Sequence, residues 1–310
     1  MITKEYDLEV VTPMFLAGAD QNNAEIRAAS IKGQLRWWWR AINGNLPLRD
    51  LKKGEEDIFG STSKRSSFSI FISNQKIKIM NQNLPSGTKV NYRSHGRFIS
   101  IIDYLAFGIA VYDKKVKGNV YTRPHIAPGS TFKIKFIFYD DSKMNEIDNA
   151  FKYFIQFGGL GSKSRNGFGS LSLINDLPQN QIPKNGERGK FTTFSSDSQL
   201  FLFNQHNKWV NALVEIGDAY RRARLSLEHS HVFERRPLVA RPLIVKNEGV
   251  FIEDRHAKSF FLHVDKINGK YQGKILVLPY QYKEASKTTK YNKVITDMCT
   301  FLSKSSRSTK

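Results

Sequence analysis

The sequence predicts an α+β fold whose N-terminal half has the strand–helix–strand–strand–helix–strand order of a split βαβ, or ferredoxin-like, unit. Three observations lead to this prediction. Residues 130–139 alternate strictly between apolar and polar side chains, which predicts a half-buried strand. Apolar residues recur at helical spacing in residues 31–43 and 145–157. The chain has 310 residues and is 40% hydrophobic, enough for a core in one large domain or two ordinary ones.

The elements of the N-terminal half follow in order. Residues 4–16 alternate and then run apolar, which predicts a strand that ends at a turn formed by Gly18–Asp20. Ser30 should cap a helix from Ile31 to about Asn43, which Gly44 stops. The alternation of side chains, the length of the apolar runs and the polarity of the remaining segments predict the other elements. Up to residue 128 they are one or two strands in 68–80, a polar loop in 81–97, a helix in 98–112 and a basic loop in 114–128. The strand 130–139, the helix 145–157, a glycine-rich loop in 158–169 and a short strand in 170–174 follow.

A second α+β unit is predicted after a polar linker, and it shows no sequence similarity to the first. Its elements are the linker 176–190, a strand at 199–203, a long amphipathic helix over 209–227, a hairpin of 259–264 and 274–279 about the Asn268–Gly269 turn, and a closing helix over 294–302. The last residues, 303–310, should be frayed.

The composition favours a polyanionic partner. Lys and Arg number 48 against 28 Asp and Glu, giving a net charge of +20 and a pI near 9.9. The excess is spread over the whole chain, so the folded body itself should be basic and should bind a long polyanion. The single cysteine, Cys299, excludes an intramolecular disulfide and a cysteine-based zinc site, and we expect no metal and no cofactor. No apolar run reaches the length of about 18 residues that spans a bilayer, and acidic residues stand near the start where a signal peptide would be apolar, so we expect a cytoplasmic protein without a membrane partner.

The predicted helix over 31–42 carries a basic row beside its apolar stripe. Lys32, Arg36 and Arg40 are spaced i, i+4, i+8 and should share one face. Like charges at this spacing repel, so the row requires solvent or an external anion. A solvated helix face is the alternative to a phosphate-binding one.

Three consecutive tryptophans stand on the same helix. Helical geometry places Trp38 in the apolar stripe and Trp39 at its edge, so both should be core residues. Trp37 points away from the stripe. It should either stack on an RNA base or a partner subunit, or pack beneath a loop.

The second feature is the glycine-rich segment 158–169, in which two Gly-apolar-Gly elements frame five residues. The glycines allow close backbone approach and should free N–H groups for phosphates. The segment follows a helix and precedes a strand, which is the reverse of a Walker or Rossmann loop. A mobile surface loop is the alternative. The candidate phosphate-binding residues of the segment are Gly159, Gly161, Ser162, Lys163, Ser164, Arg165, Asn166, Gly167 and Gly169.

Together these motifs resemble the RAMP superfamily of CRISPR RNA-binding proteins. The Gly159–Gly169 element resembles the glycine-rich signature of that superfamily. The runs Thr12–Asp20, Glu25–Gly33 and Leu35–Arg40 are similar to the first subunits of type III-B (Cmr) effector complexes.

The resemblance implies two tandem ferredoxin-like (RRM-like, βαββαβ) domains with insertions, over residues 1–178 and 190–310. It implies a non-catalytic subunit near the crRNA 3′ end that helps to capture target RNA in antiviral defence, since cleavage belongs to another subunit in that family. The expected partners are crRNA, target RNA and the other RAMP subunits of the complex. Besides the loop, the candidate RNA contacts are Arg27, Lys32, Arg36, Trp37, Arg40, Arg235 and Arg236.

A third basic surface is expected near the end of the long helix, where bidentate guanidinium groups suit phosphate or carboxylate. RNA binding, subunit docking and a solvated helix end remain open for it. It comprises Arg221, Arg222, Arg224, Arg235, Arg236 and Arg241.

Two other functions remain possible. The chain could be a metal-independent CRISPR-repeat endoribonuclease with a histidine as general base or acid, because imidazole titrates near neutrality. The candidates are His95, His125, His229 and His231. It could also be an adaptor whose basic faces meet acidic subunits. The acidic runs Glu55–Asp57 and Asp140–Asp141 should be solvated turn residues.

The RNA-binding hypothesis makes one spatial prediction. The helix row around Arg36 and the loop residues Lys163 and Arg165 are far apart in sequence, and they should converge on a single cationic trough. Acidic neighbours that neutralise both patches on opposite sides of the molecule would contradict it.

Overall fold

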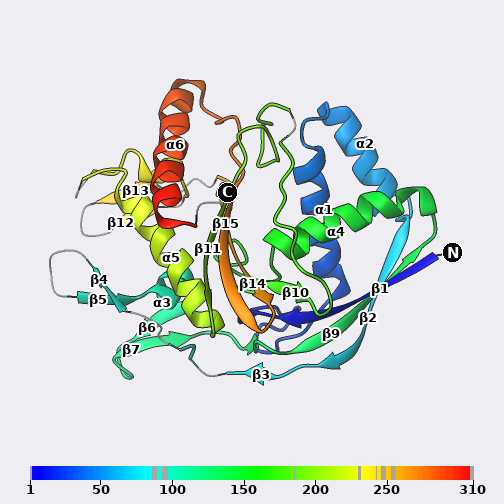
Figure 1. Ribbon diagram of the computed structural model, residues 1–310, viewed down its shortest axis with the longest axis horizontal. Coiled ribbons are helices and arrows are strands. Elements are labelled where there is room, and N and C mark those ends of the chain that lie inside the picture. The colour runs from blue at the N-terminus through cyan, green and yellow to red at the C-terminus, as the bar shows by residue number, and fades with distance from the viewer. Residues whose placement is uncertain are drawn as a thin grey trace.

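The computed structural model describes residues 2–81, 83–85, 89–92, 97–184, 186–229, 232–241, 243–245, 249–252 and 256–307. The fold is mixed α/β with antiparallel sheets (Figure 1). The helices are α1 (Ala28–Asn43), α2 (Leu48–Phe59), α3 (Ile101–Leu105), α4 (Met144–Phe157), α5 (Trp209–Leu225) and α6 (Thr288–Ser305). The strands are β1 (Ile2–Val10), β2 (Phe68–Lys76), β3 (Ile79–Met80), β4 (Lys89–Tyr92), β5 (Arg97–Ser100), β6 (Ala110–Asp113), β7 (Gly118–Tyr121), β8 (His125–Ile126), β9 (Thr131–Phe138), β10 (Leu171–Leu173), β11 (Gln199–His206), β12 (Leu243–Val245), β13 (Val250–Ile252), β14 (Phe260–Ile267) and β15 (Lys270–Val277).

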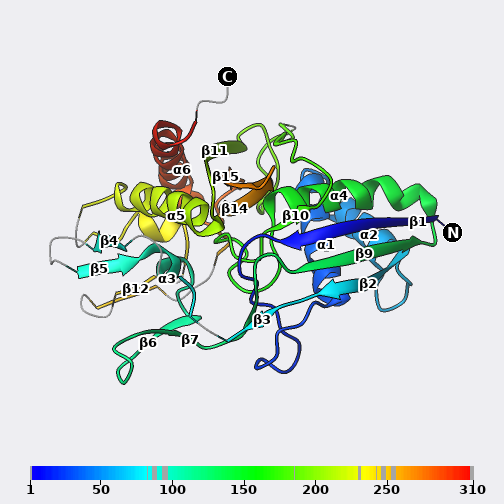
Figure 2. The ribbon, with the colours of Figure 1, turned by 60° about the horizontal axis from the view of Figure 1, so that its bottom comes forward.

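The N-terminal half forms a four-stranded sheet in the order β10-β1-β9-β2. Helices α1, α2 and α4 lie on one side of it (Figures 1 and 2). The strict alternation of β9 explains this arrangement, because every second residue from Phe132 to Phe138 is buried against the helices. The predicted order of strands and helices is therefore confirmed for this half.

The C-terminal half forms a three-stranded sheet in the order β11-β15-β14. Even-numbered residues of β14, such as Phe260, belong to the core cluster that contains α5 and α6, whereas Phe261 belongs to the cluster that contains α1 and α4. This sheet therefore lies between the helices of the two halves, as Figure 1 also shows. The predicted hairpin about Asn268–Gly269 and the long and closing helices are confirmed.

The predicted helix over residues 98–112 is wrong. The segment holds strand β5, the short helix α3 and strand β6 instead. Gly108 has φ +90°, which interrupts the apolar run, and Phe98 and Phe107 are exposed. The predicted basic loop over 114–128 contains β7 and β8, and Figure 2 shows the β6–β7 hairpin extending away from the two sheets.

Two smaller predictions about the first helices are also wrong. Helix α1 begins at Ala28 rather than Ile31, and its N-terminal cap is Arg27, whose carbonyl accepts hydrogen bonds from Ser30 and Ile31. The acidic run Glu55–Asp57 belongs to helix α2 and not to a turn.

The segment 176–190 has no helix or strand among its described residues, as expected of a linker. It is nevertheless tied to the body. The Asn180 side chain accepts a hydrogen bond from Lys274 (2.9 Å), and the Gly189 carbonyl accepts one from Gln281 (2.8 Å). None of the helices in the described part of the chain combines the length and apolar character needed to cross a bilayer.

Candidate nucleic-acid interface

The glycine-rich loop between α4 and β10 is packed against the N-terminal segment. The Ser162 N–H donates to the Phe15 carbonyl (2.8 Å), and the Gly169 N–H donates to the Pro13 carbonyl (2.9 Å). Gly161 has φ +88°, and a Cβ added there would lie 2.3 Å from the Phe15 carbonyl oxygen. This position therefore requires glycine both for its conformation and for close backbone approach.

The two Gly-apolar-Gly elements also pair with each other. The Leu160 N–H donates to the Gly169 carbonyl (2.9 Å), and Leu160 and Phe168 are fully buried. Several backbone N–H groups of the segment already donate within the protein, namely those of Gly158, Leu160, Ser162, Asn166, Gly167 and Gly169. The expectation that the glycines free N–H groups for phosphates is therefore wrong for these amides, and an anion at this loop would not be bound by them.

The tip of the loop is clamped by both halves of the chain. The Asn166 amide donates to the Leu105 carbonyl at the end of α3 (2.7 Å), and its oxygen accepts from the Lys258 ammonium (2.7 Å). Lys258 also donates to the Arg165 carbonyl (3.2 Å) and lies over the Tyr220 ring (4.1 Å). Burial, followed by the nearby arginines, lowers the pKa of Lys258 well below its usual range.

Arg165 lies where the loop meets helix α1. Its guanidinium carbon is 5.1 Å from the Trp37 ring centre and 4.8 Å from that of Phe261, and its Nη1 donates to the Lys258 carbonyl (3.3 Å). Burial lowers its pKa, although a guanidinium remains charged at neutral pH. Trp37 is half-buried, as it also contacts Trp38 edge-on.

The rest of helix α1 divides as its sequence predicts. Trp38 and Trp39 are buried core residues, which confirms their assignment. The Lys32 ammonium is 5.4 Å from the Phe68 ring centre, and burial, together with Arg36, lowers its pKa. At the helix start, Arg27 pairs with Glu25 (3.5 Å) at the surface.

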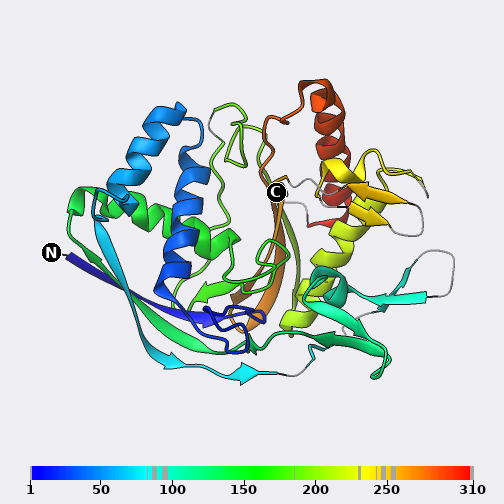
Figure 3. The same ribbon diagram turned by 180° about the vertical axis from the view of Figure 1, so that it is seen from behind.

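Helix α2 supplies a carboxylate to the basic row, which sequence reasoning missed. Glu55 pairs with the Nε atoms of Arg36 (3.2 Å) and Arg40 (3.6 Å). Arg36 also donates to the Gly60 carbonyl at the end of α2 (3.0 Å). The expectation that the row requires solvent or an external anion is therefore only partly correct. Figure 3 shows the two helices side by side.

These groups line one cavity of about 630 Å³. Helix α1 contributes Arg36, Trp37, Arg40 and Ala41, and the glycine loop contributes Arg165. The remaining wall comes from Leu48, Leu51, Lys52, Glu55, Glu56, Gly60, Ser61, Phe191, Thr192 and Ala257. The cavity thus combines guanidinium groups with apolar and aromatic surface, which suits phosphates and bases of a single strand. The structure brings Arg165 together with Arg36 and Arg40, as predicted, whereas Lys163 lies near Gly108.

The other predicted cations have intramolecular partners. Arg236 is buried and pairs with Glu228 (2.7 Å), and Arg235 pairs with Asp297. On helix α5, Asp218 pairs with the two neighbouring arginines, Arg221 (3.6 Å) and Arg222 (2.9 Å), while Arg224 donates to the Tyr104 hydroxyl (3.1 Å). Their predicted contacts with RNA stay predictions. These pairs give the arginines a structural role in the C-terminal half.

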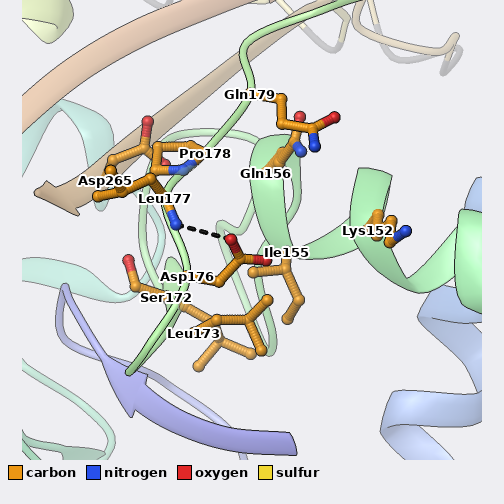
Figure 4. A pocket seen from close by; sticks show the side chains of 11 residues that line it. Lys152, Ile155, Gln156, Ser172, Leu173, Asp176, Leu177, Pro178, Gln179 and Asp265 are labelled. Atoms are coloured by element: carbon orange, nitrogen blue, oxygen red, sulfur yellow. Dashed lines mark hydrogen bonds between the residues drawn. The ribbon is translucent and has the colours of Figure 1, made fainter.

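A second cavity, of about 90 Å³, lies between α4, β10 and the linker (Figure 4). Its charged residues are Lys152, Asp176 and Asp265, so carboxylates outnumber cations. The open face of the four-stranded sheet is also unsuited to anions, because Lys133 pairs there with Glu5 (3.2 Å) and Asp7 (3.7 Å). Neither place fits a polyanion as well as the larger cavity does.

Of the histidine candidates for catalysis, His95 and His231 lie outside the described residues, and His229 is exposed. His125 is buried, with 4% of its surface exposed, and packs against Phe15. Burial lowers its pKa from 6.5 to about 4. Across the described residues, no group of three or more His, Cys, Asp or Glu side chains could hold a metal ion.

The burial of His125 predicts a pH dependence of stability. The neutral form is favoured in the folded state, so stability should be complete above pH 6.5 and should fall as the pH drops from 6.5 toward 4. Replacing His125 with glutamine should reduce this loss, measured by denaturant unfolding at several pH values. The exposed His229→Gln variant is the control. Identical pH profiles for wild type and His125→Gln would contradict the assignment.

Several contributors to the cavity and the loop clamp were absent from the sequence prediction. They are Glu55, Phe191, Ala257, Lys258 and Phe261. Only Phe261 had a usable signal, since the apolar residues at 260–262 indicate a strand buried on both faces. Glu55 depends on how α2 packs against α1, and the others depend on tertiary packing around the loop.

Known proteins are similar to this chain in sequence and in fold. The family model described as the RAMP superfamily matches residues 7–172. The CRISPR system Cmr subunit Cmr1-2 of Pyrococcus furiosus is 31% identical over 177 residues, which are 54% of this chain and 93% of that protein. Cmr subunit Cmr1-1 of the same organism is 26% identical over 178 residues, 56% of this chain and 48% of that protein.

Two solved structures are similar over nearly the whole chain. The apo crystal structure of Cmr1 from Pyrococcus furiosus has a TM-score of 0.59 at 19% identity and covers 97% of both chains. A chain in the cryo-EM structure of type III-B Cmr-beta bound to cognate target RNA has a TM-score of 0.52 at 14% identity and covers 96% of this chain and 99% of that one. At these identities the likeness concerns the fold.

Proposed function

Because the chain belongs to the RAMP superfamily, we propose that it is an RNA-binding subunit of a type III-B CRISPR effector complex. Its partners in this proposal are crRNA, target RNA and other RAMP subunits, and its place is near the crRNA 3′ end, where it helps to capture target RNA. The observation that carries the proposal is the convergence of Arg36, Arg40 and Arg165 on one cavity that Trp37 also lines. Three guanidinium groups and an indole in one cavity suit the backbone and bases of single-stranded RNA.

The proposed subunit binds RNA without cleaving it. Among the histidines that the structure describes, support comes from His125, which is buried with a pKa lowered to about 4 and is therefore poorly placed to reach a phosphodiester. His263 is likewise enclosed, with its Nδ1 2.7 Å from the Gly158 carbonyl.

The architecture we propose is a tandem of ferredoxin-like domains, 1–178 and 190–310. In the second, β11, α5, β14, β15 and α6 follow the order of the first, and the position of the fourth strand is reduced to one antiparallel bridge between Leu202 and Arg307. The insertion between α5 and β14 carries the β12–β13 hairpin.

The proposal is tested by removing the two half-exposed arginines of α1. The Arg36→Ala/Arg40→Ala variant should bind a labelled single-stranded RNA more weakly. The slope of log affinity against log salt should fall by about 1.4, since each single-strand phosphate contact contributes about 0.7. Fluorescence anisotropy over a salt series measures both quantities, and a denaturing gel of the recovered RNA should show it intact.

The control for this test is Lys293→Ala/Lys304→Ala on helix α6, where both side chains are exposed. It removes the same charge far from the cavity and should change the slope little. Equal effects of the two double variants would mean that only net charge matters, and the proposed interface would fail. Site-specific cuts in the recovered RNA would instead support the endoribonuclease.

A further inference from the structure

Among the residues that the structure describes, Glu55 is the one acidic side chain of the cavity that forms ion pairs with the basic row of helix α1. Its Oε1 lies 3.2 Å from Arg36 Nε, and its Oε2 lies 3.6 Å from Arg40 Nε. Each carboxylate oxygen thus serves a different guanidinium. Two oxygens of a phosphate can bridge two arginines in the same way, because carboxylate and phosphate present similar acceptor pairs to guanidinium.

We propose that Glu55 occupies the place of an RNA phosphate between Arg36 and Arg40, and that RNA binding displaces its side chain. The inference rests on the proposed function and concerns the regulation of that site. Glu55 competes with RNA phosphates for Arg36 and Arg40, and this competition sets the affinity of the site for the RNA backbone.

Displacement requires movement of the side chain only. Helix α2 is fixed by buried Leu51, Ile58 and Phe59, and Gly54 approaches the Trp39 ring so closely that an added Cβ would lie 3.0 Å from it. The Glu55 side chain is 19% exposed and faces the cavity, while Arg36 and Arg40 are 38% and 41% exposed. A rotation of the Glu55 side chain therefore opens the guanidinium pair while the helix stays in place.

The competition also explains a charge arrangement that is otherwise unfavourable. Without RNA, Arg36 and Arg40 are i, i+4 neighbours of like charge, and Glu55 screens their repulsion. With RNA bound, the phosphate takes over this screening. Glu55 thus acts as a counterion of the two arginines. Its side chain must move away from them when RNA binds, just as mobile counterions leave the nucleic acid when a protein binds.

The test compares Glu55→Gln with Glu56→Gln in the full chain. Both variants remove one negative charge from neighbouring residues that line the cavity, but Arg36 and Arg40 are paired with Glu55. Glu55→Gln should raise the affinity for single-stranded RNA about three- to tenfold, the range expected when two partly exposed ion pairs no longer compete. Glu56→Gln should raise it less than about twofold through screened long-range charge.

A charge-conserving variant separates competition from net charge. Glu55→Asp keeps the carboxylate on a side chain that is shorter by one methylene, so it should bridge the two arginines poorly and also raise the affinity. In the Arg36→Ala/Arg40→Ala background, Glu55→Gln should produce no gain beyond that of Glu56→Gln. Thermal unfolding of each variant confirms that it is folded before binding is measured.

Each outcome decides between the alternatives. A loss of RNA affinity in Glu55→Gln would show that Glu55 orients the arginines for RNA. Equal effects of Glu55→Gln and Glu56→Gln would show that the affinity depends on net charge alone. Either result overturns the inference. If Arg36→Ala/Arg40→Ala binds RNA as wild type does, the proposed interface itself fails. The two failures are therefore distinguishable in one set of titrations.

Discussion

Replacing Gly161 with alanine should lower the free energy of unfolding by about 2–5 kcal/mol, which combines left-handed backbone strain with overpacking. The φ angle of Gly161 is +88°, and an added Cβ would lie 2.3 Å from the Phe15 carbonyl oxygen and 2.7 Å from its carbon. These are backbone atoms held by the Ser162-to-Phe15 hydrogen bond, so no side-chain rotation relieves the clash. The loop and the N-terminal segment would have to separate.

Gly129 offers a control with the same backbone conformation and no clash. Its φ is +86°, and no atom lies within 4 Å of an added Cβ. Gly129→Ala should therefore lose only about 1–2 kcal/mol from the left-handed conformation. Urea unfolding of both variants measures the difference. Equal losses would show that the approach of the loop to Phe15 contributes nothing beyond conformational strain.

The second large effect is expected at the buried Asp265. Replacing it with asparagine should destabilise the protein by about 3–5 kcal/mol, because it leaves an uncompensated charge in the interior. The Lys274 ammonium lies 2.6 Å from Asp265 Oδ2 and is fully buried, and His263 Nε2 lies 3.2 Å from Oδ1. The neighbouring ion pair of Glu9 and Lys266 is partly exposed, so Glu9→Gln should cost about 0–1 kcal/mol and serves as the control.

The buried pair of Asp265 and Lys274 also predicts that the stability of the protein falls in acid, which tests the role given to Asp265. Burial alone would raise the pKa of Asp265, but the Lys274 charge and the nearby His263 ring hold it below its ordinary value of 3.8. The stability that this provides is complete above about pH 4 and is lost as the pH falls through the lower, folded-state value. Asp265→Asn should lack this contribution. A variant that loses as much stability on acidification as wild type would contradict it.

The sequence was sufficient to predict much of the N-terminal half. The alternation of residues 130–139 and the helical spacing of 145–157 depend on local side-chain pattern, and both elements form as predicted. Helix α2 was missed because its few apolar residues, of which Leu51, Ile58 and Phe59 are buried, stand among charged residues that were interpreted as a solvated turn. The helix predicted over 98–112 failed because apolar length alone does not distinguish a helix from short strands around Gly108.

The cationic residues of the candidate site could be predicted from the sequence, whereas the residues that pair with them could not. The charge and spacing of Arg36 and Arg40 indicated a basic face, and the framed loop singled out Arg165. That Glu55 neutralises part of this face depends on how α2 crosses α1, which no local pattern encodes. The same holds for Lys258, whose contact with Asn166 joins residues 92 positions apart.

Strand β14 is buried on both faces, with Phe260 and Phe261 on opposite sides, and this raises the question of what fixes its pairing. A slip by one residue in an ordinary half-buried strand exposes its hydrophobic side chains to water, and that penalty specifies the register. Here a slip by one residue would exchange Phe260 and Phe261 between two apolar core clusters, at little cost in hydrophobic burial. The buried polar residues His263 and Asp265 break this degeneracy, because this register lets His263 meet the Gly158 carbonyl and lets Asp265 pair with Lys274 of β15. The charges in this interior thus act as an alignment key for the sheet that joins the two halves.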